Sequence, residues 1–257
     1  MIVQLVRPIG QFAFTLILLT SCMPLEIVEP QRLYRTIATQ LRNLIAAGEW
    51  ADGKRLPAER DLAKQLGVSR PSVREALIAL EVEGVIEVRM GSGIYVQQAR
   101  KRSKPDTASD EWGPLELMRA RELVEGEVAA QAAKHARRAD IAAMGLAIEQ
   151  MRTAVKDGIV PREGDEAFHV AIASACGNEV LFDTVNQYWR ARHAPLFARL
   201  GDYFENPRSW RAAVAEHEAV LSAIAAKDSA GARSAMQQHL KKAFNRYSAS
   251  WRRAESV

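Results

Sequence analysis

Apolar positions near the start of the chain recur at the spacing of one helix face. Leu33, Ile37 and Leu41 follow this period, and Gly48 comes after them as a stop signal. The pattern predicts a first helix between Gln31 and Gly48 with a single buried stripe.

Two shorter helices are predicted next, with a glycine between them. Pro57 suits the first turn of a helix that ends at Gly67, because a proline there removes no helical hydrogen bond. Ser69 is a favourable N-cap for the next helix, which continues to Gly84. Two short helices joined by such a turn form a helix-turn-helix.

The pattern after Gly84 is typical of strands. Residues 85–88 and 94–97 flank a glycine-rich segment, 89–93, which predicts a β-hairpin. A hairpin that follows a helix-turn-helix makes a winged helix.

From Gly113 onward no alternating pattern occurs, and helical spacing continues almost to the end of the chain. Short connections separate the segments, so an antiparallel bundle is expected. The predicted helical stretches are 114–136, 139–157, 162–176, 179–200, 207–226 and 229–251. The fold class is therefore mainly α, with an N-terminal winged helix-turn-helix and a C-terminal all-α antiparallel helical bundle.

A polar segment divides these two parts. Residues 99–111 are poor in apolar side chains and are interrupted by Pro105, which describes a linker. The predicted organisation is a winged-helix domain over 23–98, a linker over 99–111, and a helical domain over 112–251.

The first 22 residues conflict with this picture. Residues 9–22 form an apolar stretch that is too short to span a bilayer but resembles a signal peptide, and residues 19–22 resemble a lipoprotein cleavage box. We interpret Met23 as the initiator and residues 1–22 as an upstream extension. The alternative is an exported protein anchored by lipid at Cys22.

Composition excludes several classes of protein. The chain has 257 residues, of which 48% are hydrophobic and 26% charged, so neither a disordered nor a collagen-like chain is expected. Its 2 cysteines exclude a disulfide framework and a four-cysteine zinc site. The net charge of +4 permits binding to nucleic acid, but residues 23–98 are neutral overall. A DNA-binding function must therefore rest on the arrangement of the charges.

That arrangement suits a DNA-reading helix. Arginine and serine gather in the first turns of the third predicted helix, the end that enters the major groove, where arginine binds guanine edges and hydroxyl groups bind phosphate. Glycines at the hairpin tip allow a close approach to DNA. Each arginine alone is equally consistent with a solvated surface. The candidate DNA-contacting residues are Arg60, Ser69, Arg70, Ser72, Arg74 and Gly91.

One stretch of this half resembles the DNA-binding domain of the GntR transcription regulators, in the branch named after FadR. Its sequence is RLPAERDLAKQLGVSRPSVREALIALEVEGVIEVRMGSGIYV. The resemblance implies DNA contacts at Arg60, Arg70 and Arg74, with contributions from the two serines and Gly91. Met90 stands where the best-known member of that branch has a histidine.

The helical half contains a candidate metal site. Asp165 and His169 are four residues apart and share a helix face, while His217 and His239 lie on two later helices. Such groups can converge in a bundle and hold a divalent metal, although a single helical histidine is more often a surface or core residue. This half resembles the FCD ligand-binding domain, which implies that these four residues are the metal ligands. Zinc is the first expectation, with nickel and manganese as alternatives.

Arg121 is the candidate cation for an anionic effector, because a buried guanidinium binds a carboxylate through two hydrogen bonds. A salt bridge to Glu125, one turn further on, explains the same residue equally well. Arg190 and Arg192 are secondary candidates.

Together these features predict a cytoplasmic, homodimeric transcription regulator that binds a pseudo-palindromic operator in double-stranded DNA. The family resemblance implies a repressor that is released by a small carboxylate. Short segments such as residues 81–84 and 91–96 resemble the corresponding segments of regulators of hexuronate use. This resemblance favours glucuronate or galacturonate as the effector. Lactate or a gluconate-like acid is the alternative.

Two other classes of protein compete with this interpretation. A metal-dependent hydrolase would use the same aspartate and histidines, but no extra glutamate base is well placed, so no enzyme activity is expected. A lipid-anchored envelope protein would leave the recognition helix without DNA, and no membrane association is expected.

Overall fold

The computed structural model describes residues 32–97 and 112–249. The predictions for residues 1–22 and for the linker 99–111 lie outside these ranges. In the described ranges no helix is both long and apolar enough to cross a membrane.

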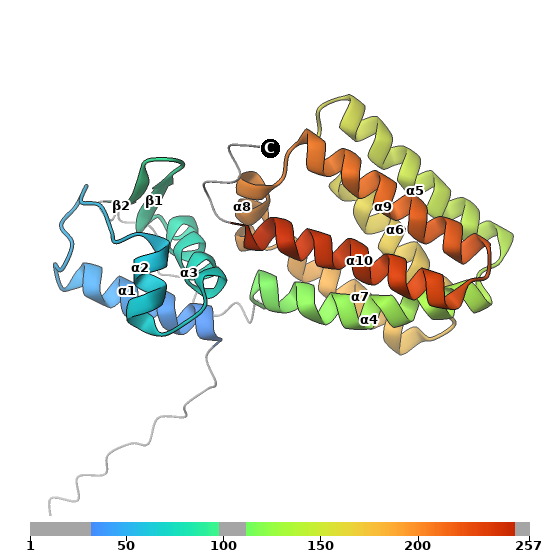
Figure 1. Ribbon diagram of the computed structural model, residues 1–257, viewed down its shortest axis with the longest axis horizontal. Helices are drawn as coiled ribbons and strands as arrows, with labels where there is room; N and C mark the ends of the chain where they lie inside the picture. Colours follow the sequence, from blue (N-terminus) through green and yellow to red (C-terminus); the bar gives the residue numbers. More distant parts are fainter. Residues whose placement is uncertain (1–31, 98–111, 250–257) are drawn as a thin grey trace, which may run out of the picture. The chain divides into compact units, whose positions relative to one another are not determined.

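The first range folds as the predicted winged helix (Figure 1). Its elements are α1 (Leu33–Ala46), α2 (Glu59–Leu66), α3 (Arg70–Val82), β1 (Ile86–Arg89) and β2 (Gly93–Val96). The two strands are antiparallel, with Ile86 opposite Val96 and Arg89 opposite Gly93.

Apolar residues of α1 and α3 form the centre of this winged helix. Ile37 and Leu41 of the predicted stripe are buried, as are Val73 and Leu77 on the inner face of α3, whereas Leu33 at the start of the predicted stripe is 52% exposed. Ser69 caps α3, because its hydroxyl oxygen accepts the backbone N–H of Ser72 at 3.3 Å. The first turns of α3 are thereby held in place beside the hairpin.

Every regular element of the second range, residues 112–249, is a helix, as the sequence predicts. Its helices are α4 (Pro114–His135), α5 (Arg138–Lys156), α6 (Arg162–Ala175), α7 (Glu179–Arg192), α8 (Pro195–Phe204), α9 (Pro207–Ala225) and α10 (Ser229–Ser248).

One predicted helix is wrong, since the stretch 179–200 forms two helices, α7 and α8. The break falls before Pro195, where Ala194 is extended with ψ 145°. A proline has no N–H to donate and disfavours helical geometry in the residue before it, so the helix cannot continue through this point.

Five helices bring their inner faces together in the bundle. Helix α4 packs along α10, α9 packs against both α5 and α10, and α6 lies beside α5 (Figure 1). Their shared interior contains large buried side chains, including Phe168, Trp189 and Met236. Polar residues on these inner faces are therefore held inside the bundle, close to one another.

Candidate metal centre and DNA-binding surface

The four predicted metal ligands lie together in the bundle. Asp165 and His169 come from α6, His217 from α9 and His239 from α10, and one ligand atom from each lies within 4.8 Å of the others. His217 Nε2 is 3.0 Å from Asp165 Oδ1 and 3.3 Å from His169 Nε2. All three imidazoles are buried. Three nitrogens and one oxygen in this arrangement form a typical donor set for zinc.

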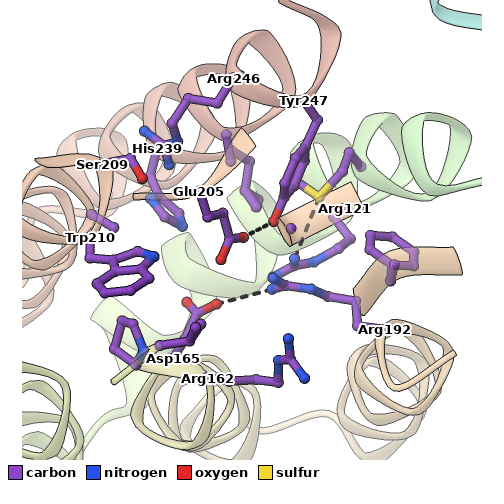
Figure 2. Close-up of a pocket in the computed structure, with 18 of the residues that line it drawn as sticks. Arg121, Arg162, Asp165, Arg192, Glu205, Ser209, Trp210, His239, Arg246 and Tyr247 are labelled. Atoms are coloured by element: carbon purple, nitrogen blue, oxygen red, sulfur yellow. Dashed lines mark hydrogen bonds and ion pairs between the residues drawn. The ribbon is translucent and has the colours of Figure 1, made fainter. Parts of the chain in front are cut away.

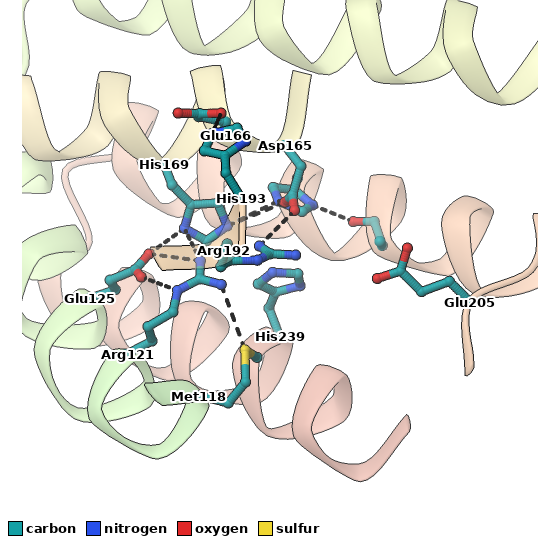
Figure 3. Close-up of polar contacts among 12 residues, drawn as sticks. Met118, Arg121, Glu125, Asp165, Glu166, His169, Arg192, His193, Glu205 and His239 are labelled. Atoms are coloured by element: carbon teal, nitrogen blue, oxygen red, sulfur yellow. Dashed lines mark hydrogen bonds and ion pairs between the residues drawn. The ribbon is translucent and has the colours of Figure 1, made fainter. Parts of the chain in front are cut away.

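The surroundings of the three imidazoles fit a metal (Figure 3). Each Nδ1 faces an oxygen acceptor, and these are a Glu125 carboxylate oxygen for His169, the Ala213 carbonyl at 2.6 Å for His217 and Glu216 Oε2 at 2.9 Å for His239. An acceptor at Nδ1 favours the tautomer with its proton there, so each Nε2 presents a lone pair. Lone pairs that converge beside a carboxylate repel one another unless a cation lies between them.

Charge at the cluster is balanced by two arginines, the buried Arg121 and the partly buried Arg192. Burial alone would raise the pKa of Glu125, but Arg121 and His169 outweigh it and lower this pKa to about 2. Burial likewise opposes the charge on Asp165, yet Arg192 at 3.0 Å holds the pKa of that carboxyl well below its ordinary value. Both carboxylates are therefore ionised at neutral pH.

Arg121 forms the salt bridge to Glu125 that the sequence analysis gave as the alternative to an effector-binding role. Its Nε lies 2.5 Å from Glu125 Oε1, and the side chain is 1% exposed. The guanidinium also stacks over the Trp189 ring, with 4.6 Å to the ring centroid. Arg121 nevertheless lines the cavity beside the cluster, so the effector role proposed for it is still consistent with its position.

That cavity lies between α4 and the helices α6 to α10 (Figure 2). Asp165 and His239 form part of its wall, which places it directly beside the metal cluster. Two other cavity residues, Glu205 and Tyr247, are joined by a hydrogen bond from the tyrosine hydroxyl. The arginines that line it are Arg121, Arg162, Arg192 and Arg246.

Two indole groups provide further donors at this cavity. The Nε1 atoms of Trp189 and Trp210 are buried and have no hydrogen-bond partner within the described parts of the chain, and both residues line the cavity. Unpartnered buried donors are rare in folded proteins because each costs free energy. These two suit an oxygen-rich ligand.

The sequence alone gave little weight to some residues that lie at the cluster and its cavity. Arg192 was only a secondary candidate, yet it contacts Asp165 and lines the cavity. Arg190 is exposed and does not line it. His135 and His193 lie outside the metal cluster. Glu216 carries no local signal, since its partner His239 lies 23 positions away along the chain.

Five of the six predicted DNA-contacting residues are accessible on the surface of the winged helix. Arg60, Ser69 and Arg70 are exposed, and Ser72 is half-buried. A groove between the starts of α2 and α3 and the hairpin is lined by Arg60, Arg70 and Gly91. Gly91 has φ 71°, a conformation that glycine adopts without strain.

Arg74 differs from the expected exposed guanidinium. Its side chain is 1% exposed, and both its Nε and its Nη2 lie 2.9 Å from Glu59 oxygens. Its Nη1 donates to the Tyr247 carbonyl at 3.2 Å, and the guanidinium lies 5.3 Å from the Phe204 ring centroid. In this arrangement Arg74 is part of the contact between α3 and the helical region.

Two carboxylates extend this contact. Glu81 accepts hydrogen bonds from Arg199 at 3.0 Å and from the Tyr203 hydroxyl at 2.7 Å, both on α8. Glu75 accepts the backbone N–H of Leu115 at 2.6 Å, in the first turn of α4. Helix α8 therefore contacts α3 through Arg199 and Tyr203, and it lines the cavity through Phe197 and Gly201.

Comparison with known proteins gives two family matches. Residues 33–96 match bacterial regulatory proteins of the gntR family, and residues 116–242 match the FCD domain.

Individual relatives match most of the chain. The "Uxu operon transcriptional regulator" of Escherichia coli (strain K12) is 37% identical over 217 residues, which cover 82% of this chain and 84% of that protein. The "Exu regulon transcriptional regulator" of the same strain is 38% identical over 223 residues, which cover 84% of each chain. A solved structure titled "Streptococcus agalactiae GntR" matches with a TM-score of 0.45 and 22% identity, over 82% of this chain and 99% of that one.

Proposed function

This chain belongs to the GntR family of bacterial regulatory proteins, and we propose that it represses transcription until a small carboxylate effector binds its FCD domain. The observation that carries the effector site is the buried cluster of three histidines and Asp165 beside a cavity lined by arginines. The family consists of transcription regulators, so the metal-dependent hydrolase is set aside.

On the DNA side, a cytoplasmic homodimer presents two winged helices to a pseudo-palindromic operator. Arg60 and Arg70 bind base edges or phosphate from the starts of α2 and α3, and Ser69 and Ser72 bind phosphate. Gly91 lets the hairpin tip approach the duplex. Arg74 joins these contacts only if Glu59 and the Tyr247 carbonyl release its guanidinium, because both hold it now.

On the effector side, Asp165, His169, His217 and His239 hold a divalent metal, with zinc first and nickel or manganese as alternatives. A metal bound there would supply positive charge beside the cavity. Arg121 and Arg192, which lie against the cluster and line the cavity, would bind the effector carboxylate, and the Trp189 and Trp210 indoles would donate to its hydroxyl oxygens.

A hexuronate is the effector class we favour. The relatives named for the Uxu operon and the Exu regulon align over most of this chain. A hexuronate has one carboxylate and several hydroxyl groups, which suits a cavity with both guanidinium and indole donors. The domain division proposed from the sequence, 23–98 and 112–251, assigns DNA binding to one half and effector binding to the other.

The effector acts by shifting a conformational equilibrium. Helix α8 and Tyr247 each contact both the cavity and α3, so a ligand that moves the Glu205–Tyr247 pair also disturbs the contacts of Arg74 and Glu81. The DNA-binding helices are then held differently with and without effector.

A titration of the full-length protein against the DNA upstream of its own coding sequence tests this function. The titration is made at fixed salt, with and without glucuronate, galacturonate or lactate, and with a scrambled duplex as control. We expect specific binding that a hexuronate releases. Release by lactate alone would replace the effector, and equal affinity for the scrambled duplex would contradict the regulator itself.

A further inference from the structure

One arginine in the DNA-binding groove has no carboxylate partner. The groove between α2, α3 and the hairpin is lined by four arginines. Three of them are ion-paired, Arg60 with Asp61 at 3.3 Å, Arg70 with Glu59 at 2.9 Å and Arg89 with Glu87 at 2.7 Å. The fourth, Arg55, is exposed and has no ion pair within residues 32–97 or 112–249. Its positive charge is therefore uncompensated.

The backbone of Arg55 is fixed against the hairpin. Leu56 N donates to the Ile94 carbonyl at 2.8 Å, and Val96 N donates to the Lys54 carbonyl at 2.9 Å. Arg55 itself forms an isolated antiparallel bridge with Tyr95. These bonds tie residues 54–56 to β2, so little backbone entropy is left for Arg55 to lose on binding.

Gly93 makes room for the Arg55 side chain. A Cβ added at Gly93 would lie 2.4 Å from Arg55 Nε, closer than any two such atoms can approach, and the glycine has φ 139°. The guanidinium therefore lies across the backbone at the start of β2. A side chain at position 93 would displace it and would also strain the backbone.

The place of Arg55 in the groove indicates what it contacts. A winged helix that inserts α3 into the major groove and its hairpin into the neighbouring minor groove must straddle the phosphodiester strand that separates the two grooves of the duplex. The surface between α3 and the hairpin faces that strand, and Arg55 is on this surface. A guanidinium there meets phosphate oxygens and no base edges.

We propose that Arg55, positioned by Gly93, is a phosphate-binding residue that sets the position of the winged helix on DNA without reading sequence. This proposal rests on the proposed function, because it concerns the same DNA-binding groove. It adds a residue, and a role for Gly93, to the contacts predicted at α2, α3 and Gly91.

Arg55→Ala in the full-length protein tests the proposal, with binding measured to the upstream DNA and to a scrambled duplex over a series of salt concentrations. We expect affinity to fall about tenfold per subunit, as for one charge-assisted hydrogen bond, and so about 100-fold for the homodimer, by a similar factor on both duplexes. The slope of log affinity against log salt should decrease by about 1.8, because the homodimer loses two phosphate contacts at about 0.9 each. Arg55→Lys should restore most of the affinity and the slope.

Lys156→Ala is the matched control, because it removes one exposed positive charge from α5 in the helical region. It should leave both affinity and slope unchanged. Gly93→Ala should lower affinity in the wild type but add little to Arg55→Ala, with thermal unfolding used to check that the hairpin is intact.

Each other outcome overturns the proposal. A loss confined to the upstream duplex would make Arg55 a base-reading residue, and an unchanged affinity or slope would show that it makes no phosphate contact. If the wild type fails to distinguish the two duplexes, the proposed regulator function fails. If the wild type distinguishes the two duplexes, and Arg55→Ala has the same affinity and salt slope as the wild type, only the present inference fails.

Discussion

At the scale of single residues, the acceptors behind the histidines are as informative as the histidines themselves. Glu216 faces His239 Nδ1 and the Ala213 carbonyl faces His217 Nδ1. Because these contacts orient each Nε2 toward Asp165, the cluster is arranged to bind a cation before one arrives.

His217→Ala is expected to abolish stoichiometric zinc binding. A lost hydrogen-bond partner behind a ligand costs about 10–100-fold in metal affinity, and losing a ligand itself should cost at least as much. The measurement is the zinc content of protein purified and dialysed against a weak chelator. His193→Ala is the control, since His193 is half-exposed and pairs with Glu166 outside the cluster. Equal zinc loss in both variants would contradict the assignment.

Glu75 gives a prediction for pH dependence. Burial raises the pKa of its carboxyl from the ordinary 4.5 to about 7, although the Leu115 N–H opposes this shift. The charged form of Glu75 is therefore disfavoured in the folded protein. The contribution of the protonated carboxyl to the free energy of unfolding is complete below pH 4.5 and is lost as the pH rises through 7.

Glu75→Gln should remove this pH dependence, because glutamine stays neutral and still accepts from Leu115 N. Relative to wild type, its free energy of unfolding should rise by roughly 3 kcal/mol between pH 4 and pH 8, from a shift of about 2.5 pKa units. Chemical denaturation at both pH values measures the difference. A constant difference would show that Glu75 is ionised in the folded protein.

At the scale of elements, caps and breaks decide which residues reach the site. The break before Pro195 separates α7, which carries Trp189 and Arg192, from α8, which carries Arg199 and Tyr203. A continuous helix could not direct both sets of side chains to their partners, because its faces are tied to one helical period. Pro195 therefore ends one helix and also lets α7 and α8 present their side chains in different directions.

Asn206→Ala should destabilise α9, the helix that holds His217. The Asn206 side-chain oxygen accepts the backbone N–H groups of Arg208 and Ser209, both at 3.0 Å. Loss of such an N-cap costs about 1 kcal/mol of unfolding free energy. Thermal or urea unfolding measures it.

Asn43→Ala is the control for that prediction, because Asn43 is exposed within α1 and caps no helix. Alanine there should be neutral or slightly stabilising. The capping role would be refuted by equal stability of the two variants.

At the scale of the whole molecule, the contact between α8 and α3 is the route by which the cavity reaches the DNA-binding helix. Glu81 takes part through Arg199 and Tyr203, and it also accepts the backbone N–H of Val88 in β1 at 3.0 Å. One carboxylate thus joins α3, the hairpin and α8.

Arg199→Ala should uncouple effector binding from DNA release. Coupling free energies between sites are typically about 1–3 kcal/mol, so the ratio of operator affinities without and with effector should fall by about fivefold or more. Both affinities are measured for the variant and the wild type, with zinc content expected to be unchanged.

Arg208→Ala is the control for the coupling prediction, since it removes an exposed arginine from α9. It should preserve the wild-type ratio. A ratio that Arg199→Ala leaves unchanged would show that effector binding is transmitted by another contact.

Periodicity and caps were enough to predict the fold class, because they act over a few residues. The buried stripe of α1, the Ser69 cap and the hairpin all follow from neighbours in the sequence. The helix break before Pro195 was missed although its signal was local, since apolar periodicity continues across it. The pairing of Asp165 with His169 also follows from a spacing of four.

Local patterns along the chain were enough to predict the winged helix, the helical bundle and the residues able to bind a metal, because local backbone preferences and side-chain chemistry do not depend on distant contacts. Only the tertiary structure decided that His169 meets His217, 48 positions later, and that Arg74 is buried against Glu59 and Tyr247. It also decided that Arg55 alone in its groove has no carboxylate partner among the residues described. These features arise when separate helices and strands pack together, and the distance between two side chains in a packed structure is unrelated to their separation along the chain.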